Sequence, residues 1–126
     1  MDDAAAGEGV PPVLLRAVAQ HESAMRSDAV HRNANGSLDI GLMQINSGWL
    51  PVLKRYGIAA HDLLDPCVNA YVGAWIIESN VVRFGATWKA VGAYNASSPD
   101  GQLRYADAVY GVLVRQSAPA NAPARW

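Results

Sequence analysis

The sequence predicts a single, mainly α-helical domain, on three observations. Apolar residues recur at three- and four-residue steps along most of the chain, which is the spacing of one helix face. Residue types that start and stop helices separate these stretches. The chain has 126 residues, of which 51% are hydrophobic, enough for one core and too few for two ordinary domains. We expect at most a small β-hairpin, near residues 36–41.

The first predicted helix covers residues 13–25 and carries a glutamate on its apolar side. Leu14, Val18 and Met25 fall on one stripe of this helix, and Glu22 lies on the same stripe. Burial disfavours a charged carboxylate, so a glutamate there is either paired with a cation or held protonated for use as an acid. The alternative is a glutamate at the solvent edge of the stripe.

Four more helices are predicted after a turn signal at Asn35-Gly36. Ser47, Asp65 and Thr87 are expected to cap the first three of them, and the fourth follows a loop over residues 95–100. The side chains expected to face the core from these helices are Trp49, Val52, Leu53, Tyr56, Tyr71, Trp75, Ile76, Trp88, Val91, Tyr94, Leu103, Ala106, Val109, Tyr110 and Leu113. The three tryptophans among them are alternatively platforms for sugar rings.

Charge and composition exclude several classes of function. The formal net charge is −1 and the basic residues are spread singly, so we expect no binding of nucleic acid. No apolar run approaches the roughly 20 residues of a membrane span. The single cysteine, Cys67, is either a buried small hydrophobe or one of a pair whose partner lies outside this chain. His21, His31 and His61 lack ligand spacing, so we expect no metal and no cofactor.

The two ends of the chain differ from the domain between them. Residues 1–9 lack the cationic and apolar segments of a secretory signal, which indicates either a cytoplasmic protein or a chain whose signal has been removed. We interpret residues 1–9 as the remnant after signal removal and residues 10–116 as the domain. Residues 117–126 are rich in Pro and Ala and are expected to be a disordered tail.

Four short segments resemble the motifs of one enzyme family. They are Glu22-Ser23, Gly41-Leu42-Met43-Gln44-Ile45-Asn46, Ala93-Tyr94-Asn95 and Tyr105. In this order and at these separations they resemble the lytic transglycosylases of the soluble Slt type, which share the fold of goose-type lysozyme. The resemblance covers about residues 10 to 113 and implies a lysozyme-like domain.

The residues around these motifs narrow the resemblance. Segments 20–25, 39–47 and 64–67 look like the specialised transglycosylases encoded beside type III secretion, type IV secretion and pilus systems. This implies export to the periplasm, peptidoglycan glycan strands as substrate, and secretion-system or pilus components as partners. Many such proteins carry an N-terminal cysteine that could pair with the one matching Cys67. We expect a monomer.

The resemblance also implies a reaction. The family cleaves the β-1,4 bond between N-acetylmuramic acid and N-acetylglucosamine, with Glu22 in the position of the acid. The C6 hydroxyl of the muramic acid then attacks in place of water, and a 1,6-anhydro ring forms. The residues matched to substrate binding are Ser23, Gly41, Met43, Gln44, Asn46, Tyr94, Asn95 and Tyr105.

Each matched residue also has a purely structural alternative. Ser23 bonds Glu22 or the substrate, or is satisfied by backbone. Gly41 allows close approach to the sugar, or simply forms a turn. Met43 lines the cleft by resemblance, whereas its pattern alone indicates core. Gln44 and Asn46 offer amide groups to sugar hydroxyls and acetamido groups, or tie the loop to the helices.

The resemblance assigns the two tyrosines and Asn95 to the surroundings of Glu22. Tyr94 would orient the glutamate, Asn95 would hold the acetamido group, and Tyr105 would reach Glu22 from the last helix. Otherwise Tyr94 and Tyr105 are core residues and Asn95 is a helix stop. The family often continues with Gly after this Asn, whereas Ala96 follows here, which leaves the shape of this loop open.

A second carboxylate, Asp39, leaves the mechanism open. It follows Glu22 by 17 residues, a separation similar to that of the two carboxylates in hen-type lysozyme. In a cleft it would stabilise an oxocarbenium-like transition state or support attack by water, which would make the protein a hydrolytic muramidase. Otherwise it is a turn aspartate that caps its own loop. From another class of function, the rival is a non-catalytic glycan-binding scaffold of a secretion apparatus.

Overall fold

A computed structural model describes residues 1, 4–5 and 9–117. Its α-helices are α2 (Pro12–Ser23), α3 (Leu50–Lys54), α4 (Pro66–Phe84), α5 (Trp88–Gly92) and α6 (Pro99–Ser117). Two 3₁₀ helices, η1 (Ser47–Trp49) and η2 (Ala60–Leu64), flank α3, and the strands are β1 (Val30–Arg32), β2 (Leu38–Ile40) and β3 (Ile45–Asn46). The predicted mainly α-helical class is confirmed.

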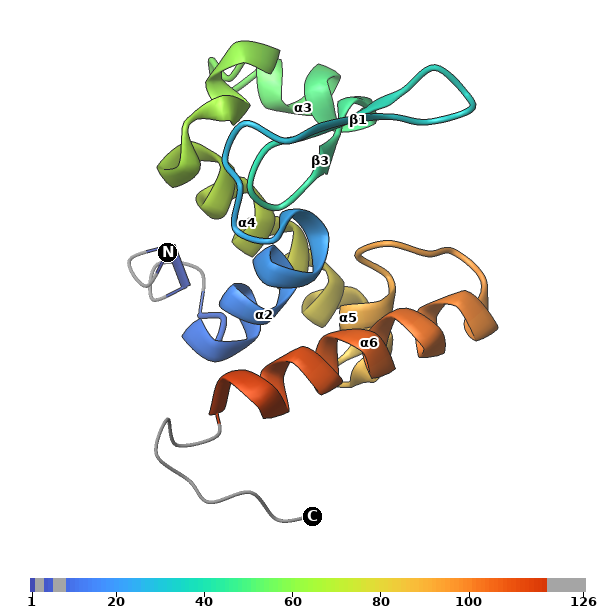
Figure 1. The fold of residues 1–126 in the computed structure, drawn as a ribbon. Helices are drawn as coiled ribbons and strands as arrows, with labels where there is room; N and C mark the ends of the chain where they lie inside the picture. The colour runs from blue at the N-terminus through green and yellow to red at the C-terminus, as the bar shows by residue number, and fades with distance from the viewer. Residues whose placement is uncertain (2–3, 6–8, 118–126) are drawn as a thin grey trace.

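The helices and the sheet divide the described chain into two parts joined by α4 (Figure 1). On one side, α6 packs against both α2 and α5, and α5 packs against α4. On the other side, the sheet contacts η1, η2 and α4. Of the four matched segments, Glu22-Ser23 therefore comes from α2 and residues 41–46 from the sheet region. Residues 93–95 and Tyr105 come from the α5–α6 region.

The β-structure is a three-stranded antiparallel sheet in the order β1-β2-β3. In its register Val30 pairs with Ile40, Arg32 with Leu38, and Asp39 with Asn46. The small hairpin expected near residues 36–41 is present, but strands extend on both sides of that range. Strands of two or three residues are too short for the alternating pattern that identifies a strand in a sequence.

The three predicted helix caps have different outcomes. Asp65 Oδ1 accepts hydrogen bonds from the N–H groups of Cys67 and Val68, at 2.8 and 3.2 Å, so this cap is confirmed. The cap predicted at Ser47 is wrong. Asn46, one residue earlier, accepts the N–H of Gly48 at 2.9 Å, and Ser47 Oγ instead accepts the N–H of Leu38 at 3.0 Å. Thr87 precedes α5 without a side-chain capping bond.

The first helix is shorter than predicted, because it ends at Ser23. Ala24 takes a left-handed conformation with φ 52°, and its N–H bonds back to the carbonyls of Ala19 and Gln20. Met25 also has a positive φ, of 64°, and its side chain is exposed. Met25 is therefore outside the helix and outside the core, whereas Val18 is buried as predicted.

The core lies between α2, α4, α6 and the sheet. Its largest fully buried side chains are Leu15, Val18, Met43, Ile45, Leu63, Asn69, Ile77 and Val109. Ala4 and Ala5 are also buried in it, although they precede the predicted domain boundary. The predicted tail covers residues 117–126, of which Ser117 is the last residue of α6 and residues 118–126 lie outside the described residues. No described helix combines the length and the apolarity that crossing a membrane requires.

Several aromatic and apolar residues predicted to be core are exposed. They are Tyr56, Tyr71, Trp88, Leu103 and Tyr110. A helical pattern predicts which residues share a face, but not whether another element covers that face. Tyr56 and Tyr71, for example, line an apolar surface groove together with Trp75. Cys67 is exposed too, so its interpretation as a buried small hydrophobe is wrong.

Candidate active site

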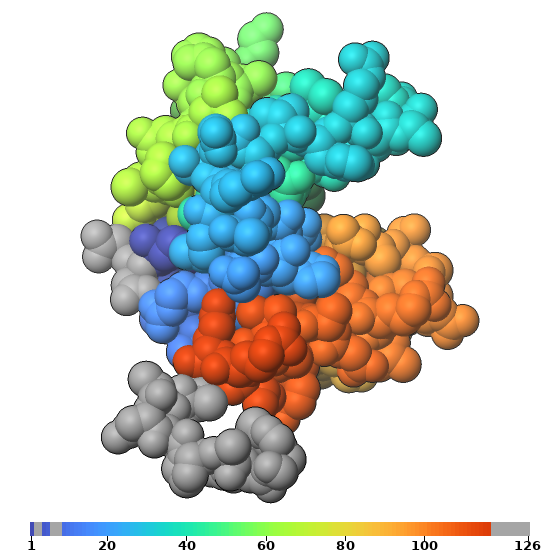
Figure 2. All heavy atoms as spheres, viewed as in Figure 1, coloured from blue at the N-terminus to red at the C-terminus, as the bar shows by residue number. Residues whose placement is uncertain are grey.

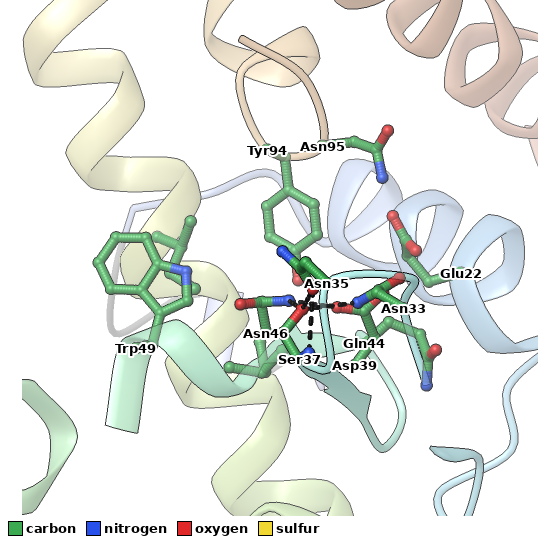
Figure 3. Close-up of a pocket in the computed structure, with 12 residues that line it drawn as sticks. Glu22, Asn33, Asn35, Ser37, Asp39, Gln44, Asn46, Trp49, Tyr94 and Asn95 are labelled. Carbon is green, nitrogen blue, oxygen red and sulfur yellow. Dashed lines mark hydrogen bonds between the residues drawn. The ribbon is translucent and has the colours of Figure 1, made fainter. Parts of the chain in front are cut away.

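A polar cleft lies between the sheet and the α5–α6 region, where Figure 2 shows the surface hollowed. Its volume is about 280 Å³. The residues that line it are Glu22, Asn33, Asn35, Ser37, Asp39, Gln44, Ile45, Asn46, Trp49, Ile76, Tyr94 and Asn95. In Figure 3, Glu22 and Trp49 lie at opposite ends of the cleft, with Tyr94 and Asn95 on one side and Asp39 and Asn46 on the other.

Glu22 occupies the last turn of α2 and is half-buried. The hydroxyl of Tyr105, on α6, donates a hydrogen bond to its Oε2 at 2.5 Å. The Tyr105 ring is held by the His21 ring, edge to face at 5.2 Å, and by the stacked ring of Tyr94 at 6.3 Å. One carboxylate oxygen of Glu22 is therefore fixed by the protein, while Glu22 itself lines the cleft.

The surroundings of Glu22 place its pKa near neutrality. Burial is the largest cause, and together with the negative charge of Asp39 it raises the pKa from 4.5 to about 7, although the Tyr105 hydrogen bond acts in the opposite direction. Burial, followed by the charge of Glu22, also raises the pKa values of Tyr105 and Tyr94, so both stay protonated. A carboxyl group with a pKa near 7 can both give and take a proton.

The backbone of residues 40–43 is held by side chains from α2, from α4 and from the turn that follows α5. Asn69, on α4, accepts the N–H of Met43 at 2.8 Å and donates to the carbonyls of Ile40 and Leu63, both at 2.8 Å. Ser23, on α2, donates to the carbonyl of Leu42 at 2.6 Å. We call these bonds, with that from Tyr94 to the carbonyl of Met43 at 2.6 Å, the Asn69 network.

For Ser23, Gly41 and Met43 this network agrees with the structural alternative given above, and it gives Tyr94 another partner than the resemblance implies. Ser23 bonds backbone rather than Glu22, because its hydroxyl points at the adjacent loop. Gly41 has a φ of 78°, and a Cβ there would collide with Asn69 and Leu63, so the packing inside the protein already requires a glycine. Met43 is fully buried, so its side chain does not line the cleft. Tyr94 bonds the Met43 carbonyl, and Tyr105 is the tyrosine that bonds Glu22.

The remaining matched residues do line the cleft. Gln44 has a positive φ of 53°, and its amide donates to the carbonyls of Ala29 and Gly41 at 3.1 and 3.0 Å. Asn46 donates to Asp39 Oδ1 at 2.9 Å. Asn46 therefore combines both alternatives, since it ties the loop together and faces the cleft. Asn95 lines the same cleft from beyond α5.

Asp39 lies in β2 and lines the same cleft as Glu22. It is therefore not a turn aspartate that caps its own loop. Its partner across the sheet is Asn46, whose amide bonds it. One cleft therefore holds both carboxylates.

Sequence reasoning missed three residues of the hairpin that line the cleft, Asn33, Asn35 and Ser37. Ser37 Oγ donates to Asn35 at 2.6 Å and accepts from Asn33 and Asn46, both at 3.1 Å. We call this set, with the bond from Asn46 to Asp39, the Ser37 network. Asn, Gly and Ser are the usual residues of turns, so only their high density over residues 33–37 offered a signal.

One tryptophan belongs to the lining of the site. Trp49 lines the cleft and is half-buried, with its ring edge to face against Trp75 at 5.5 Å, so it combines a packing role with access to a ligand. Among the described residues, no three His, Cys, Asp or Glu side chains group as a metal site would require. The chemistry that this arrangement offers is proton transfer by Glu22 within a cleft lined by amides and hydroxyls.

Comparison with known proteins agrees with this arrangement. Residues 1–105 match the family described as "Transglycosylase SLT domain". The chain is 48% identical over 102 residues to the invasion protein IagB of Salmonella typhimurium, a match that covers 77% of this chain and 64% of IagB. It is 37% identical over 123 residues to protein IpgF of Shigella flexneri, covering 92% of this chain and 81% of IpgF. A peptidoglycan-binding-like protein of Escherichia coli O157:H7 is 39% identical over 118 residues, covering 84% and 71%. The chain thus spans just under two thirds of the length of IagB.

Proposed function

This chain belongs to the transglycosylase SLT domain family, and we propose that it is a lytic transglycosylase of peptidoglycan. The proposed reaction cleaves the β-1,4 bond between N-acetylmuramic acid and N-acetylglucosamine and leaves a 1,6-anhydromuramic end. The observation that carries the proposal is Glu22, a half-buried carboxyl group with a pKa of about 7, bonded by Tyr105 at the edge of a polar cleft. The amides and hydroxyls of the cleft suit the neutral hydroxyl and acetamido groups of a glycan.

The proposed mechanism uses one carboxyl group twice. Protonated Glu22 donates its proton to the glycosidic oxygen as the bond from that oxygen to C1 of the muramic acid breaks, and the acetamido oxygen assists at C1. The Glu22 carboxylate then takes the proton of the C6 hydroxyl while O6 bonds C1 and the acetamido oxygen leaves C1, which closes the anhydro ring and restores the acid. No water is consumed, and the attacking group is already part of the substrate. Tyr105 would keep Glu22 oriented through both steps.

The test is mass spectrometry of the soluble fragments released from purified peptidoglycan, with Glu22→Gln as the control. Fragments lighter by one water than hydrolysis products, and resistant to borohydride reduction, are the expected result. Glu22→Gln should release none, because the amide cannot donate an acidic proton while it keeps the shape of the side chain. Fragments from Glu22→Gln at the wild-type rate would contradict the assignment of Glu22.

A second candidate function is hydrolysis by a muramidase mechanism, and the position of Asp39 favours it. Asp39 lines the same cleft as Glu22, and its charge contributes to the raised pKa of Glu22. A carboxylate there would stabilise positive charge at C1 while water attacks. Reducible ends in the same experiment would support this candidate. A protein that binds glycan strands but cleaves none would instead be a binding module, as the name of the Escherichia coli relative suggests for that protein.

We further propose that the protein acts in the periplasm and opens the cell wall locally for a secretion system or pilus. The support is the similarity to IagB, whose name describes it as an invasion protein, and the proposed substrate, which lies outside the cytoplasmic membrane. The test is to express the natural full-length gene product with Glu22 intact or replaced by Gln, and to measure its location and the secretion of apparatus substrates. Normal secretion in the Glu22→Gln strain would contradict this role.

A further inference from the structure

A second pocket continues from the cleft on the other side of Glu22. Its volume is about 500 Å³. Glu22 and Gln44 line both hollows, so these two residues lie at the boundary between them. In Figure 3 they lie together at the end of the cleft away from Trp49. The other residues that line the second pocket are Gln20, His21, Ser23, Ala24, Arg26, Ala29, Val30 and His31.

The two hollows differ in charge. The cleft is lined by two carboxylates, Glu22 and Asp39, and by no basic side chain. The second pocket has Arg26 and two imidazoles, those of His21 and His31, and its one carboxylate is Glu22 at the boundary. Because a charged group is recognised by the opposite charge, the cleft suits neutral sugars and the second pocket suits an anion.

Arg26 is available to such an anion. Its side chain is exposed, and no carboxylate among the described residues forms an ion pair with it. Asp28, two residues further along, does not line the pocket. The Arg26 backbone, in contrast, is fixed, since its N–H bonds both the carbonyl and the hydroxyl oxygen of Ser23 at 3.1 Å. A guanidinium on a fixed backbone presents its paired N–H donors to a carboxylate at little cost in ordering.

The walls of this pocket also contain backbone in a left-handed conformation. Its non-glycine residues with positive φ are Ala24, Met25 and Gln44, of which Ala24 and Gln44 line the pocket. Residues other than glycine seldom adopt this conformation, and such positions gather at ligand-binding sites. The left-handed pair Ala24 and Met25 turns the chain back after α2 and so brings Arg26 to the pocket beside Glu22.

We propose that this pocket binds a free carboxylate of the peptide stem that the glycan strand carries, with Arg26 as its principal partner. The inference rests on the proposed function, since the substrate there is peptidoglycan. Glycan rings carry no charge, whereas the peptides attached to the muramic acid lactyl groups end in carboxylates and carry them on side chains. His31, on β1, also lines the pocket and adds a second hydrogen-bond donor. The pocket thereby favours strands that still carry their peptides.

The test is a binding measurement on the full chain with Glu22→Gln, which prevents turnover. Calorimetry would compare two glycan oligomers, one with its stem peptides and one from which an amidase has removed them. The lactyl carboxylates that the amidase frees are converted to methylamides, so that the second oligomer carries no charge. Arg26→Ala is added to the Glu22→Gln chain, and Arg55→Ala, which removes an exposed arginine at the end of α3 outside both hollows, is the matched control. Turnover by the wild-type chain on both oligomers is recorded separately and tests the proposed function by itself.

Arg26→Ala is expected to weaken binding of the peptide-bearing oligomer about tenfold, because a charge-assisted bidentate contact is lost. It should change binding of the stripped oligomer much less, and Arg55→Ala should change neither. Converting the peptide carboxylates to amides should weaken binding to the Arg26-containing chain by a similar factor. Equal losses for both oligomers, no loss for either, or no binding of either oligomer would overturn the proposal. Wild-type turnover of neither oligomer, with the Arg26 dependence present, would instead reject the proposed function alone.

Discussion

Two hydrogen-bond networks shape opposite sides of the segment from β2 to β3, and they differ in burial. The Asn69 network is inside the protein, where Asn69 is fully buried and bonds backbone groups of Ile40, Met43 and Leu63. The Ser37 network lies at the surface of the hairpin and joins side chains to side chains. Both end at residues that line the cleft, Tyr94 from the first and Asp39 from the second.

The difference in burial determines what each network can do. A buried donor or acceptor that loses its partner keeps the full cost of desolvation, whereas an exposed one regains water. The Asn69 network therefore sets the shape of the loop beside Glu22 and tolerates little change. The Ser37 network can change with small effects on stability, so it is the part of the cleft where the preference for particular glycans can vary.

The largest effect is expected from Asn69→Leu, which keeps the volume but removes three hydrogen bonds. The N–H of Met43 and the carbonyls of Ile40 and Leu63 would stay buried without partners. At about 1–3 kcal/mol for each such group, the free energy of unfolding should fall by about 3 kcal/mol or more. Urea unfolding monitored by circular dichroism measures it.

Asn80→Leu is the matched control on the same helix. Asn80 is partly buried and donates one bond, to the carbonyl of Ala90 at 3.1 Å, so its loss should cost about 1 kcal/mol. Equal losses of stability for the two variants would show that burial does not separate them. The contrast between the two networks would then have no energetic basis.

The next effect concerns Glu22, whose raised pKa makes it a source of instability at neutral pH. Its pKa is about 7 in the folded chain against 4.5 for the unperturbed group, so the folded state binds the extra proton between these values. Stability must therefore fall as pH rises from about 4.5 to about 7, and stay lower above it. Glu22→Gln removes this loss and should be more stable than wild type by about 2 kcal/mol at pH 8, a figure reduced for partial exposure.

Thermal unfolding at pH 4 and at pH 8 tests this expectation. The two proteins should differ little at pH 4, where Glu22 is protonated in both states, and most at pH 8. A Glu22→Gln chain less stable than wild type at pH 8 would mean that the carboxylate is paired in the folded state. Glu22 would then not be a protonated acid at neutral pH.

The candidate site was predictable from the sequence where its signals are local. The apolar helical stripe that carries Glu22 and the short motifs at residues 41–46 and 93–95 can each be recognised within a few consecutive residues. The Asn69 network was not predictable, because Asn69 bonds backbone groups up to 29 residues away, and backbone partners leave no trace in residue types. The same holds for Met43, whose side chain is buried, and for Tyr94, which lines the cleft and bonds the Met43 carbonyl.

The cleft-lining residues of the hairpin were not predicted, for a different reason. Asn33, Asn35 and Ser37 are residues that any tight turn would contain, so their place in the cleft could not be separated from their role in the turn. The fold class was easier, since long helices repeat their pattern over many residues, whereas the two- and three-residue strands do not. Sequence reasoning thus found the residues next to the reacting groups and missed those that extend the cleft.

Tyr105→Phe and Asp39→Asn should move the pH profile in opposite directions. The Tyr105 hydrogen bond lowers the pKa of Glu22, so its loss should extend activity to higher pH, with a rate about tenfold lower because the carboxyl is less well oriented. The charge of Asp39 raises that pKa, so its removal should bring the alkaline limb to lower pH. Profiles of kcat/KM against pH measure both shifts.

Tyr110→Phe, an exposed tyrosine on the same helix as Tyr105, is the control and should leave the profile unchanged. Shifts in the same direction for Tyr105→Phe and Asp39→Asn would contradict the stated causes of the raised pKa. Loss of all activity in Asp39→Asn, with its fold intact, would move Asp39 from a tuning role to a direct part in the reaction. That outcome would favour the hydrolytic alternative.

The smallest effect is expected from Ser37→Ala, which removes the hydroxyl at the centre of the Ser37 network. Asn33, Asn35 and Asn46 each lose a bond to Ser37, but all three amides can bond water instead, so stability should fall by less than about 1 kcal/mol. The freed side chains must be ordered again when a glycan binds, which should raise KM about threefold. The value of kcat should not change, because neither Glu22 nor Tyr105 bonds this network. Ser79→Ala on α4, outside the cleft, is the control and should alter none of these values. A fall in kcat for Ser37→Ala would mean that the Ser37 network also positions Glu22 or Tyr105.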